Sequence, residues 1–123
     1  MKRVAVLGAS AKRWKFGNKA VRAHLAAGWE VIPVNRHESE IEGVPVVRSL
    51  AEAPRPLDRV TVYLHPERTL ALLPEIAAVA PREVYFNPGS ADAEVLAAAE
   101  RLGLRAIDDC SIVALGLSPA DFP

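Results

Sequence analysis

The stretch that decides the fold is residues 4–18, VAVLGASAKRWKFGN, in which an apolar run stops at a glycine and a basic loop leads into a helical pattern. A buried strand that ends in small residues beside a helix start leaves backbone N–H groups unpaired at the positive end of the helix dipole, where an anion is stabilised. Lys12, Arg13 and Lys15 add the cations that a diphosphate requires. The stretch therefore predicts a phosphate-binding turn; a tight strand-to-helix turn with a solvated charged loop is the alternative.

The composition excludes several other classes of protein. A chain of 123 residues, half of them apolar, is long enough for one domain, residues 1–123, with a single core. Its 15 basic and 15 acidic residues cancel, so we expect a small-molecule ligand and neither a nucleic acid nor a membrane as partner. Cys110 is the only cysteine, which excludes a disulfide framework and a multi-cysteine metal site. Without a signal-peptide pattern or an apolar run of membrane length, a cytoplasmic location is expected.

Short apolar runs alternate with longer segments of helical period along the whole chain. This alternation predicts strands at residues 3–7, 30–34, 44–47, 59–64, 83–86 and 104–107, and helices at 19–27, from 66 onward and at 92–102. Pro74 lies so deep in the second helix that a kink or a restart is expected there. Alternating strands and helices pair in parallel through right-handed crossovers, which predicts a single-domain, doubly wound α/β sheet with helices on both faces. Its ligand would bind outside the carboxyl ends of the strands.

Two positions test whether the nucleotide is NAD. The dinucleotide fingerprint G-x-G-x-x-G follows the first strand in NAD-binding proteins, whereas residues 8–13 read GASAKR, with only Gly8 in place. NAD also requires an acid at the end of the second strand, where this chain has Asn35 and Arg36. NAD is therefore disfavoured. An arginine there suits a phosphorylated ribose, which leaves NADP and coenzyme A (CoA), unless Arg36 is a solvated loop residue.

Four segments together resemble a known family. VAVLGAS at 4–10, VIPVN at 31–35, NPGS at 87–90 and GLRAIDDCSIV at 103–113 look like the small stand-alone CoA-binding proteins. Those proteins are similar to the nucleotide-binding domain of the succinyl-CoA synthetase alpha subunit. The resemblance covers nearly the whole chain and implies a Rossmann-like fold with CoA as the ligand. The resemblance does not imply acyl-CoA synthesis, because this chain does not resemble the second synthetase domain, which supplies the phosphorylated histidine.

The resemblance also implies which residues contact which part of the ligand. The first loop would hold the diphosphate, the end of the second strand would approach the adenosine and its phosphate, and the later turns would flank the adenine and the pantetheine arm. Trp14 either lies over the cofactor or closes the mouth of the sheet as a partly buried side chain. The residues implied for these three regions are Gly8, Ala9, Ser10 and Arg13; Val34, Asn35 and Arg36; and Leu64, His65, Pro66, Asn87, Pro88 and Gly89.

No loop after a strand carries a recognisable pair of nucleophile and base, and no residues have metal-ligand spacing. His24 and His37 are expected at the surface, His65 on the ligand side of the sheet, and Cys110 in the core, so that a mixed disulfide with CoA is disfavoured. We therefore expect a protein that binds CoA or an acyl-CoA without catalysing a reaction. An NADP-dependent oxidoreductase, for which a Tyr-Lys pair at helical spacing is missing, and a nucleotide-sensing module with an unknown protein partner are the alternatives.

Overall fold

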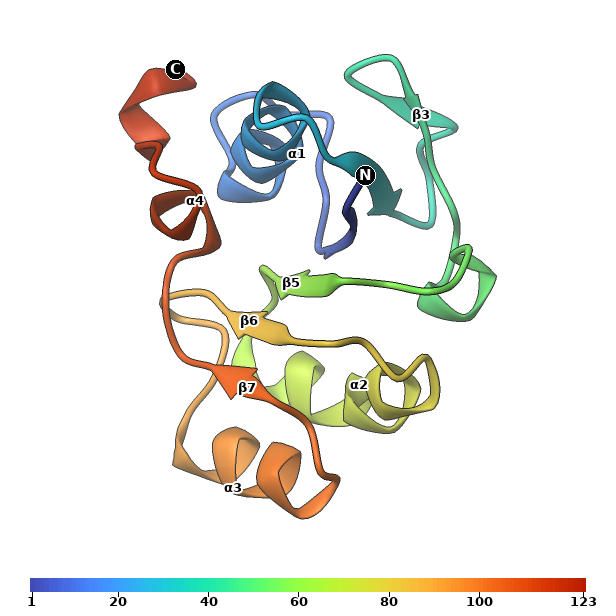
Figure 1. Ribbon diagram of the computed structural model, residues 1–123, viewed down its shortest axis with the longest axis vertical. Helices are drawn as coiled ribbons and strands as arrows, with labels where there is room; N and C mark the ends of the chain where they lie inside the picture. The colour runs from blue at the N-terminus through green and yellow to red at the C-terminus, as the bar shows by residue number, and fades with distance from the viewer.

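Five parallel strands form the central sheet in the computed structural model, which describes residues 1–123 (Figure 1). Their order is β2-β1-β5-β6-β7, so the chain runs outward from β1 to β2 and then returns to the other side of β1. The topological switch point therefore lies between β1 and β5, where ligands of such sheets bind. The strands are β1 (Arg3–Leu7), β2 (Glu30–Val34), β5 (Arg59–Val62), β6 (Val84–Phe86) and β7 (Ala106–Ile107).

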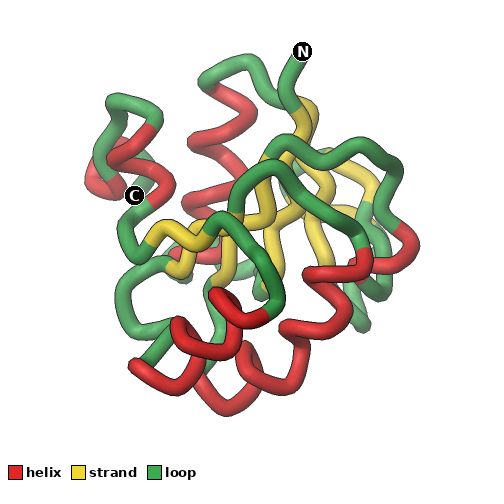
Figure 2. The backbone as a smooth tube through the Cα atoms, turned by 60° about the horizontal axis from the view of Figure 1, so that its bottom comes forward, coloured by secondary structure: helices red, strands yellow, loops and turns green.

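Helices cover both faces of this sheet, which confirms the predicted doubly wound architecture (Figure 2). Successive residues of a strand point to opposite faces, so each strand contributes to two cores. Val4 and Val6 of β1 pack with α1 (Phe16–Ala26) and α4 (Ser111–Ala114), whereas Ala5 and Leu7 pack with α2 (Pro66–Ala78) and α3 (Ala93–Arg101). No helix is both long and apolar enough to cross a lipid bilayer.

Residues 44–47 form less of a strand than predicted. β3 (Glu40–Ile41) pairs antiparallel with β4 (Val44–Pro45) in a small hairpin, and only Val47 reaches the main sheet, through a single parallel bridge to Val34. A short 3-10 helix, η1 (Leu50–Glu52), then leads toward β5, and a second one, η2 (Pro119–Asp121), lies near the C-terminus. The segment after β2 thus supplies a hairpin beside the first loop.

Of the kink or restart predicted at Pro74, the restart is wrong, because α2 continues through this residue from Pro66 to Ala78, and the kink stays a prediction. Pro74 lacks the N–H that would bond to the preceding turn. Leu73 and Ile76, on either side of it, are both buried in the core beneath the sheet. We attribute the continuity of the helix to this burial, which holds both turns against the sheet.

Candidate functional site

β1 and α1 press closely together at the turn that joins them. Gly8 has a φ of +92°, and a Cβ there would lie 2.5 Å from the carbonyl oxygen of Tyr63. A Cβ at Gly17, in the first turn of α1, would collide with the carbonyl of Gly8. Glycine is therefore required at both positions. Gly17 was not recognised from the sequence as a site residue, because its distance from Gly8 differs from the spacing of the dinucleotide fingerprint.

The backbone of this turn offers several unused hydrogen-bond donors. No acceptor within the protein takes up the N–H groups of Gly8, Ala9 and Ser10, whereas the N–H of Lys12 donates to Ser10 Oγ at 3.1 Å. α1 begins directly after the loop and carries no acidic residue in its first turn. Free amides at a helix N-terminus bind anions. The turn thus has the free donors beside a helix start that the sequence predicts, and phosphate binding there stays a prediction.

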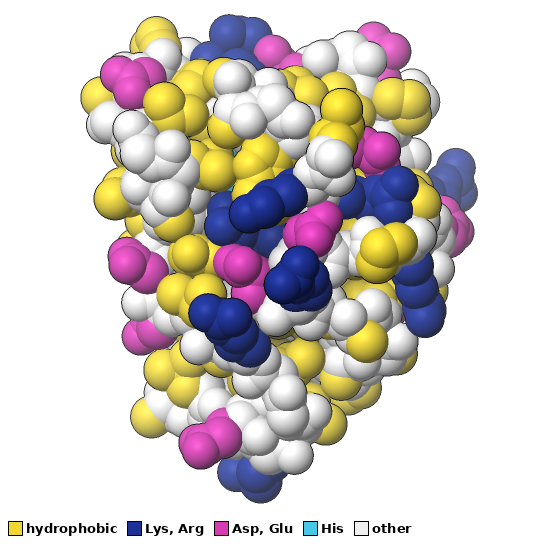
Figure 3. Space-filling model, viewed as in Figure 1, with side chains coloured by type: hydrophobic (Ala, Val, Ile, Leu, Met, Phe, Trp, Pro, Cys, Tyr) yellow, Lys and Arg dark blue, Asp and Glu magenta, His cyan; other side chains and the backbone are white.

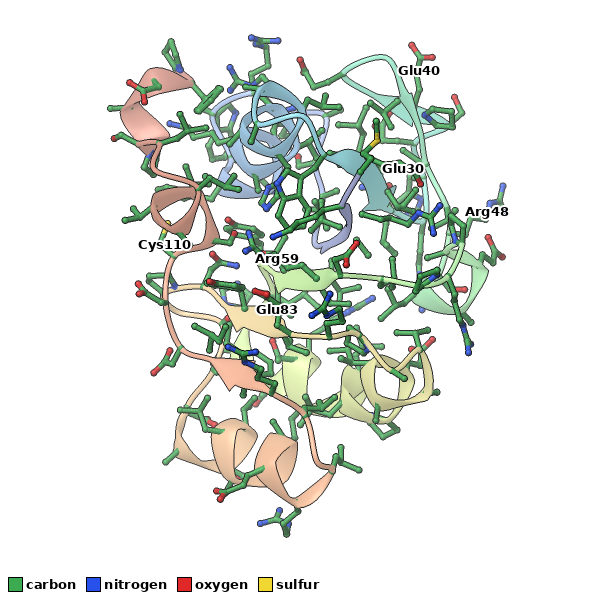
Figure 4. The ribbon with its side chains drawn as sticks, viewed as in Figure 1. Glu30, Glu40, Arg48, Arg59, Glu83 and Cys110 are labelled. Atoms are coloured by element: carbon green, nitrogen blue, oxygen red, sulfur yellow. The ribbon has the colours of Figure 1, made fainter.

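A first cavity of about 470 Å³ lies on one side of this turn. Three arginines from three separate segments line it: Arg36 after β2, Arg48 before η1, and Arg68 on α2. None of their guanidinium groups makes an ion pair or a hydrogen bond within the protein. Figure 4 shows Arg48 beside η1, at the edge of the molecule. These free cations suit a phosphate monoester.

A second cavity, of about 810 Å³, lies on the other side and shares part of its wall with the first. Its remaining walls come from the first loop, the ends of β5 and β6, and the start of α4. The two cavities therefore adjoin at the turn that carries the free amides. The residues common to both are Gly8, Ala9, Asn35, Leu64 and Arg68.

A buried polar network supports the second cavity. Asn87 Nδ2 donates to Thr61 Oγ1 at 2.7 Å, and Asn87 Oδ1 accepts from the N–H of Ser111 at 2.8 Å. The Ser111 hydroxyl lies 2.7 Å from Thr61 Oγ1 and 3.1 Å from the Tyr63 hydroxyl. Burial raises the pKa of Tyr63 to about 12, so its hydroxyl stays protonated. This network fixes the ends of β5 and β6 against the start of α4.

The structure brings together all but two of the residues predicted for the site. Val34, Asn35 and Arg36 line the first cavity, and Gly8, Ala9 and Leu64 line both. Those that line the second cavity are Ser10, Trp14, His65, Asn87, Pro88 and Gly89. Trp14 is 69% exposed, so it does not close the sheet as a buried side chain.

The two predicted residues outside both cavities are Arg13 and Pro66. The guanidinium of Arg13 pairs with Glu42 at 2.7 Å and is 60% exposed, and Pro66 is the first residue of α2. Direct contact between Arg13 and a diphosphate therefore stays a prediction.

Several residues in the cavity walls were not expected there. His37, assigned to the surface, is exposed but lines the first cavity together with Arg48 and Arg68. His65 is thus not the only histidine on this side of the sheet. Cys110, assigned to the core, is half-buried and lines the second cavity. Spacing along the chain carried no signal for these residues, because they converge only through the register of the sheet.

A separate basic cluster lies at the opposite, amino-terminal end of the strands. The Arg59 guanidinium lies 4.5 Å from the ring centre of Trp29 and 4.3 Å from that of Tyr85, and 3.3 Å from a Glu83 oxygen. Its Nη1 lies 3.2 Å from His24 Nε2. The expectation that His24 is a surface residue is wrong, because α1 packs this ring against the sheet. Burial lowers the pKa of His24 to about 4.

Comparisons with known proteins agree with the fold. The model of the CoA binding domain family matches residues 2–116. A conserved hypothetical protein from Pyrococcus furiosus is 30% identical, with a TM-score of 0.86 over 93% of this chain and 99% of that one. A Thermus thermophilus protein is also 30% identical, with a TM-score of 0.84 over 91% of this chain and 86% of that one.

The curated relative YneT, from Bacillus subtilis (strain 168), is 39% identical over 67 residues, which are 54% of this chain. The match spans 50% of the length of YneT. The family model, in contrast, extends over nearly the whole chain, from β1 past α4. On this evidence the chain belongs to the CoA binding domain family.

Proposed function

We propose that the chain binds CoA or an acyl-CoA along the two adjoining cavities and does not itself catalyse a reaction. One observation carries this proposal: a cavity with three free arginines and a larger cavity meet at a turn with free backbone amides. The parts of CoA follow one another in the matching order: a phosphorylated adenosine, a diphosphate, and a long uncharged arm that ends in a thiol.

The first cavity suits the adenosine and its 3′-phosphate. Leu50, Leu64 and Leu72 supply apolar surface for a purine ring, and Arg36 and Arg48 supply cations for the phosphate. Arg68 lines both cavities, so we place it beside the diphosphate. A charge-assisted hydrogen bond from arginine to phosphate contributes about 1.5–3 kcal/mol.

The second cavity suits the pantetheine arm. Trp14, Phe16 and Pro88 offer apolar surface along its wall, and Tyr63 is part of the same wall. Cys110 also lines this cavity. An arm of alternating amide and methylene groups requires such a mixture of apolar contacts with a few polar groups.

The hydrogen bonds of the two cavity serines support a binding role without catalysis. The hydroxyl of Ser10 accepts from the N–H of Lys12, and that of Ser90 donates to the carbonyl of Asn87 at 2.7 Å. Neither is hydrogen-bonded to the imidazole of His65. A serine nucleophile needs a base within hydrogen-bond reach.

Isothermal titration calorimetry with CoA, NADPH and NADH tests the ligand. We expect CoA to bind most tightly and NADH weakly or not at all. Tighter binding of NADPH than of CoA would favour an NADP-dependent oxidoreductase, and no binding of CoA would overturn the proposal. Native mass spectrometry of the purified protein provides an independent test, through the mass of any co-purified nucleotide.

Incubation with acetyl-CoA and succinyl-CoA, followed by measurement of free thiol, tests the absence of catalysis. We expect release at the uncatalysed rate in the wild type and in His65→Ala. Release above that rate which disappears in His65→Ala would make the protein an enzyme.

A further inference from the structure

We propose that Glu42, on the β3–β4 hairpin, is a positioning residue for the phosphate-binding turn. Its carboxylate contacts the first loop and the start of α1 and holds the loop in place, an arrangement that we call the clamp. The inference rests on the proposed function, because the turn that Glu42 supports is the one assigned to the diphosphate. Glu42 itself lies in neither cavity.

The hairpin holds Glu42 in a conformation that costs free energy. Glu42 has a φ of +52° and is followed by Gly43 at +75°, in the two-residue connection between β3 and β4. Asn, Asp or Gly is preferred where such a turn requires a positive φ. The neighbouring Ile41 is fully buried in the core under α1, which anchors the hairpin. A glutamate at this strained position points to a role for its carboxylate.

Both carboxylate oxygens contact the first loop or the start of α1. Oε1 accepts from Nη1 of Arg13 at 2.7 Å, and Oε2 accepts from Nδ2 of Asn18 at 3.0 Å. The same Nδ2 donates to the carbonyl of Ser10 at 3.0 Å, and Asn18 Oδ1 accepts from Nε of Arg22 at 2.7 Å. Asn18 is fully buried, so every polar atom of its side chain is committed to this arrangement.

The chain of contacts from Glu42 through Asn18 orients the backbone of the turn. In a trans peptide the C=O and the following N–H point in opposite directions. Because the carbonyl of Ser10 points at Asn18, the N–H of Ala11 points away from it and has no acceptor within the protein. Arg22 Nη2 holds the other part of the loop by donating to the carbonyl of Arg13 at 2.8 Å. The clamp therefore leaves the N–H of Ala11 available to an anion and holds in place the loop that also carries the free N–H groups of Gly8, Ala9 and Ser10.

The proposal makes a prediction opposite to that of simple electrostatics. CoA is a polyanion, so the loss of a nearby negative charge should tighten its binding, whether by reducing repulsion or by releasing Arg13. A clamp predicts weaker binding, because the turn must be ordered again when the diphosphate binds. Whether CoA affinity falls or rises when the negative charge is removed therefore decides between the clamp and simple electrostatics.

The test compares Glu42→Ala and Glu42→Gln with the matched controls Glu40→Ala and Glu40→Gln. Glu40 lies on the same hairpin, is exposed and makes no ion pair, and Figure 4 shows it projecting outward from the molecule. Alanine keeps the Cβ and hence the backbone strain of Glu42, and glutamine keeps one acceptor oxygen. Calorimetry should show CoA binding about tenfold weaker in Glu42→Ala, an intermediate loss in Glu42→Gln, and changes below about twofold in the controls. Unchanged or tighter binding in Glu42→Ala would overturn the proposal.

NMR relaxation of the backbone amides in ligand-free protein supplies a second readout, which reports the order of the turn without any ligand. The amides of residues 9–15 should become more mobile in Glu42→Ala, while those of the strands keep their wild-type values. Equal loop mobility in the variant and the wild type would exclude the clamp. If the wild type did not bind CoA, the proposed function would fall, and the relaxation data would still decide whether Glu42 orders the turn.

Discussion

Two groups of arginines, one at each end of the central sheet, differ in whether they are paired within the protein. At the amino ends of the strands, Arg3 pairs with Glu30 and Arg59 pairs with Glu83. Figure 4 shows Glu30, Arg59 and Glu83 near the middle of the view, and Figure 3 shows basic and acidic side chains intermixed over that face. At the carboxyl ends, the guanidinium groups of the three arginines of the first cavity have no partner.

This difference separates charges that hold the fold from charges that are available to a ligand. A formal net charge of zero conceals it, because the acidic residues are not distributed evenly around the basic ones. An arginine whose charge is neutralised within the protein contributes to stability, and its removal leaves a carboxylate unpaired. An exposed arginine in a cavity wall contributes little to stability, so its removal should affect binding alone.

The largest expected effect comes from breaking the turn at the carboxyl end. In Gly8→Ala, the new Cβ would lie 2.5 Å from the Tyr63 carbonyl oxygen at a φ of +92°. We expect the free energy of unfolding to fall by about 3 kcal/mol or more and CoA binding to be lost. Gly28→Ala is the control, because its φ of +84° carries the same conformational cost with open space around the Cβ. It should cost about 1 kcal/mol in urea unfolding. Equal losses in the two variants would show that the close approach at Gly8 is unimportant.

The same substitution at the two ends should have opposite consequences. Arg59→Met leaves Glu83 and His24 without their partner and should lower the free energy of unfolding by about 3 kcal/mol, with CoA affinity within about twofold of the wild type. Arg48→Met should leave stability within about 0.5 kcal/mol and weaken CoA. Urea unfolding and calorimetry on both variants measure the two effects. The comparison would fail if Arg48→Met destabilised the protein as much as Arg59→Met.

Acid should destabilise the amino-terminal end through His24. Burial, with a smaller contribution from the Arg59 charge, lowers its pKa from 6.5 to about 4, so the unfolded chain takes up a proton at a higher pH than the folded protein does. The free energy of unfolding is therefore at its full value above about pH 7, where His24 is neutral in both states. It declines as the pH falls through 6.5 toward 4, by at most about 1.4 kcal/mol per pH unit.

Urea unfolding at pH 7, 6 and 5 measures this decline. His24→Gln should have a flatter pH dependence than the wild type, whereas the control His37→Gln, at an exposed position, should keep the wild-type slope. The same slope in His24→Gln and the wild type would contradict the assignment.

Arg68→Ala should produce a smaller effect that is confined to binding. Because Arg68 lines both cavities, we expect CoA and dephospho-CoA to lose affinity alike, by about tenfold, with no change in the melting temperature. Arg105, exposed and outside both cavities, supplies the control Arg105→Ala, which should bind both ligands as the wild type does. A loss limited to CoA would move Arg68 from the diphosphate to the 3′-phosphate.

The fold and the centre of the site were predictable because they depend on short-range patterns. Apolar runs alternating with helical segments indicated the sheet, and Gly8 after a buried strand indicated the turn. Tertiary packing decided the remainder. Pro74 is tolerated because its neighbours are buried, and His24 is buried because its helix face meets the sheet.

The basic character of the first cavity was only partly predictable. Arg36 follows β2 directly and was expected near the ligand, whereas Arg48 and Arg68 come from segments whose convergence depends on the path of the chain after β2. The same holds for Glu42, since the small hairpin that places it beside Arg13 was not predicted from the pattern.

We propose that Arg36 and Arg48, which are unpaired at the carboxyl end of the sheet, bind the ligand's phosphate monoester. Calorimetry with CoA and dephospho-CoA on the wild type and on Arg36→Ala tests it most directly, because the two ligands differ only in the 3′-phosphate. We expect the wild type to prefer CoA by about tenfold or more and this preference nearly to disappear in Arg36→Ala. Equal affinity of the wild type for the two ligands, or a preference that survives in Arg36→Ala, would contradict it.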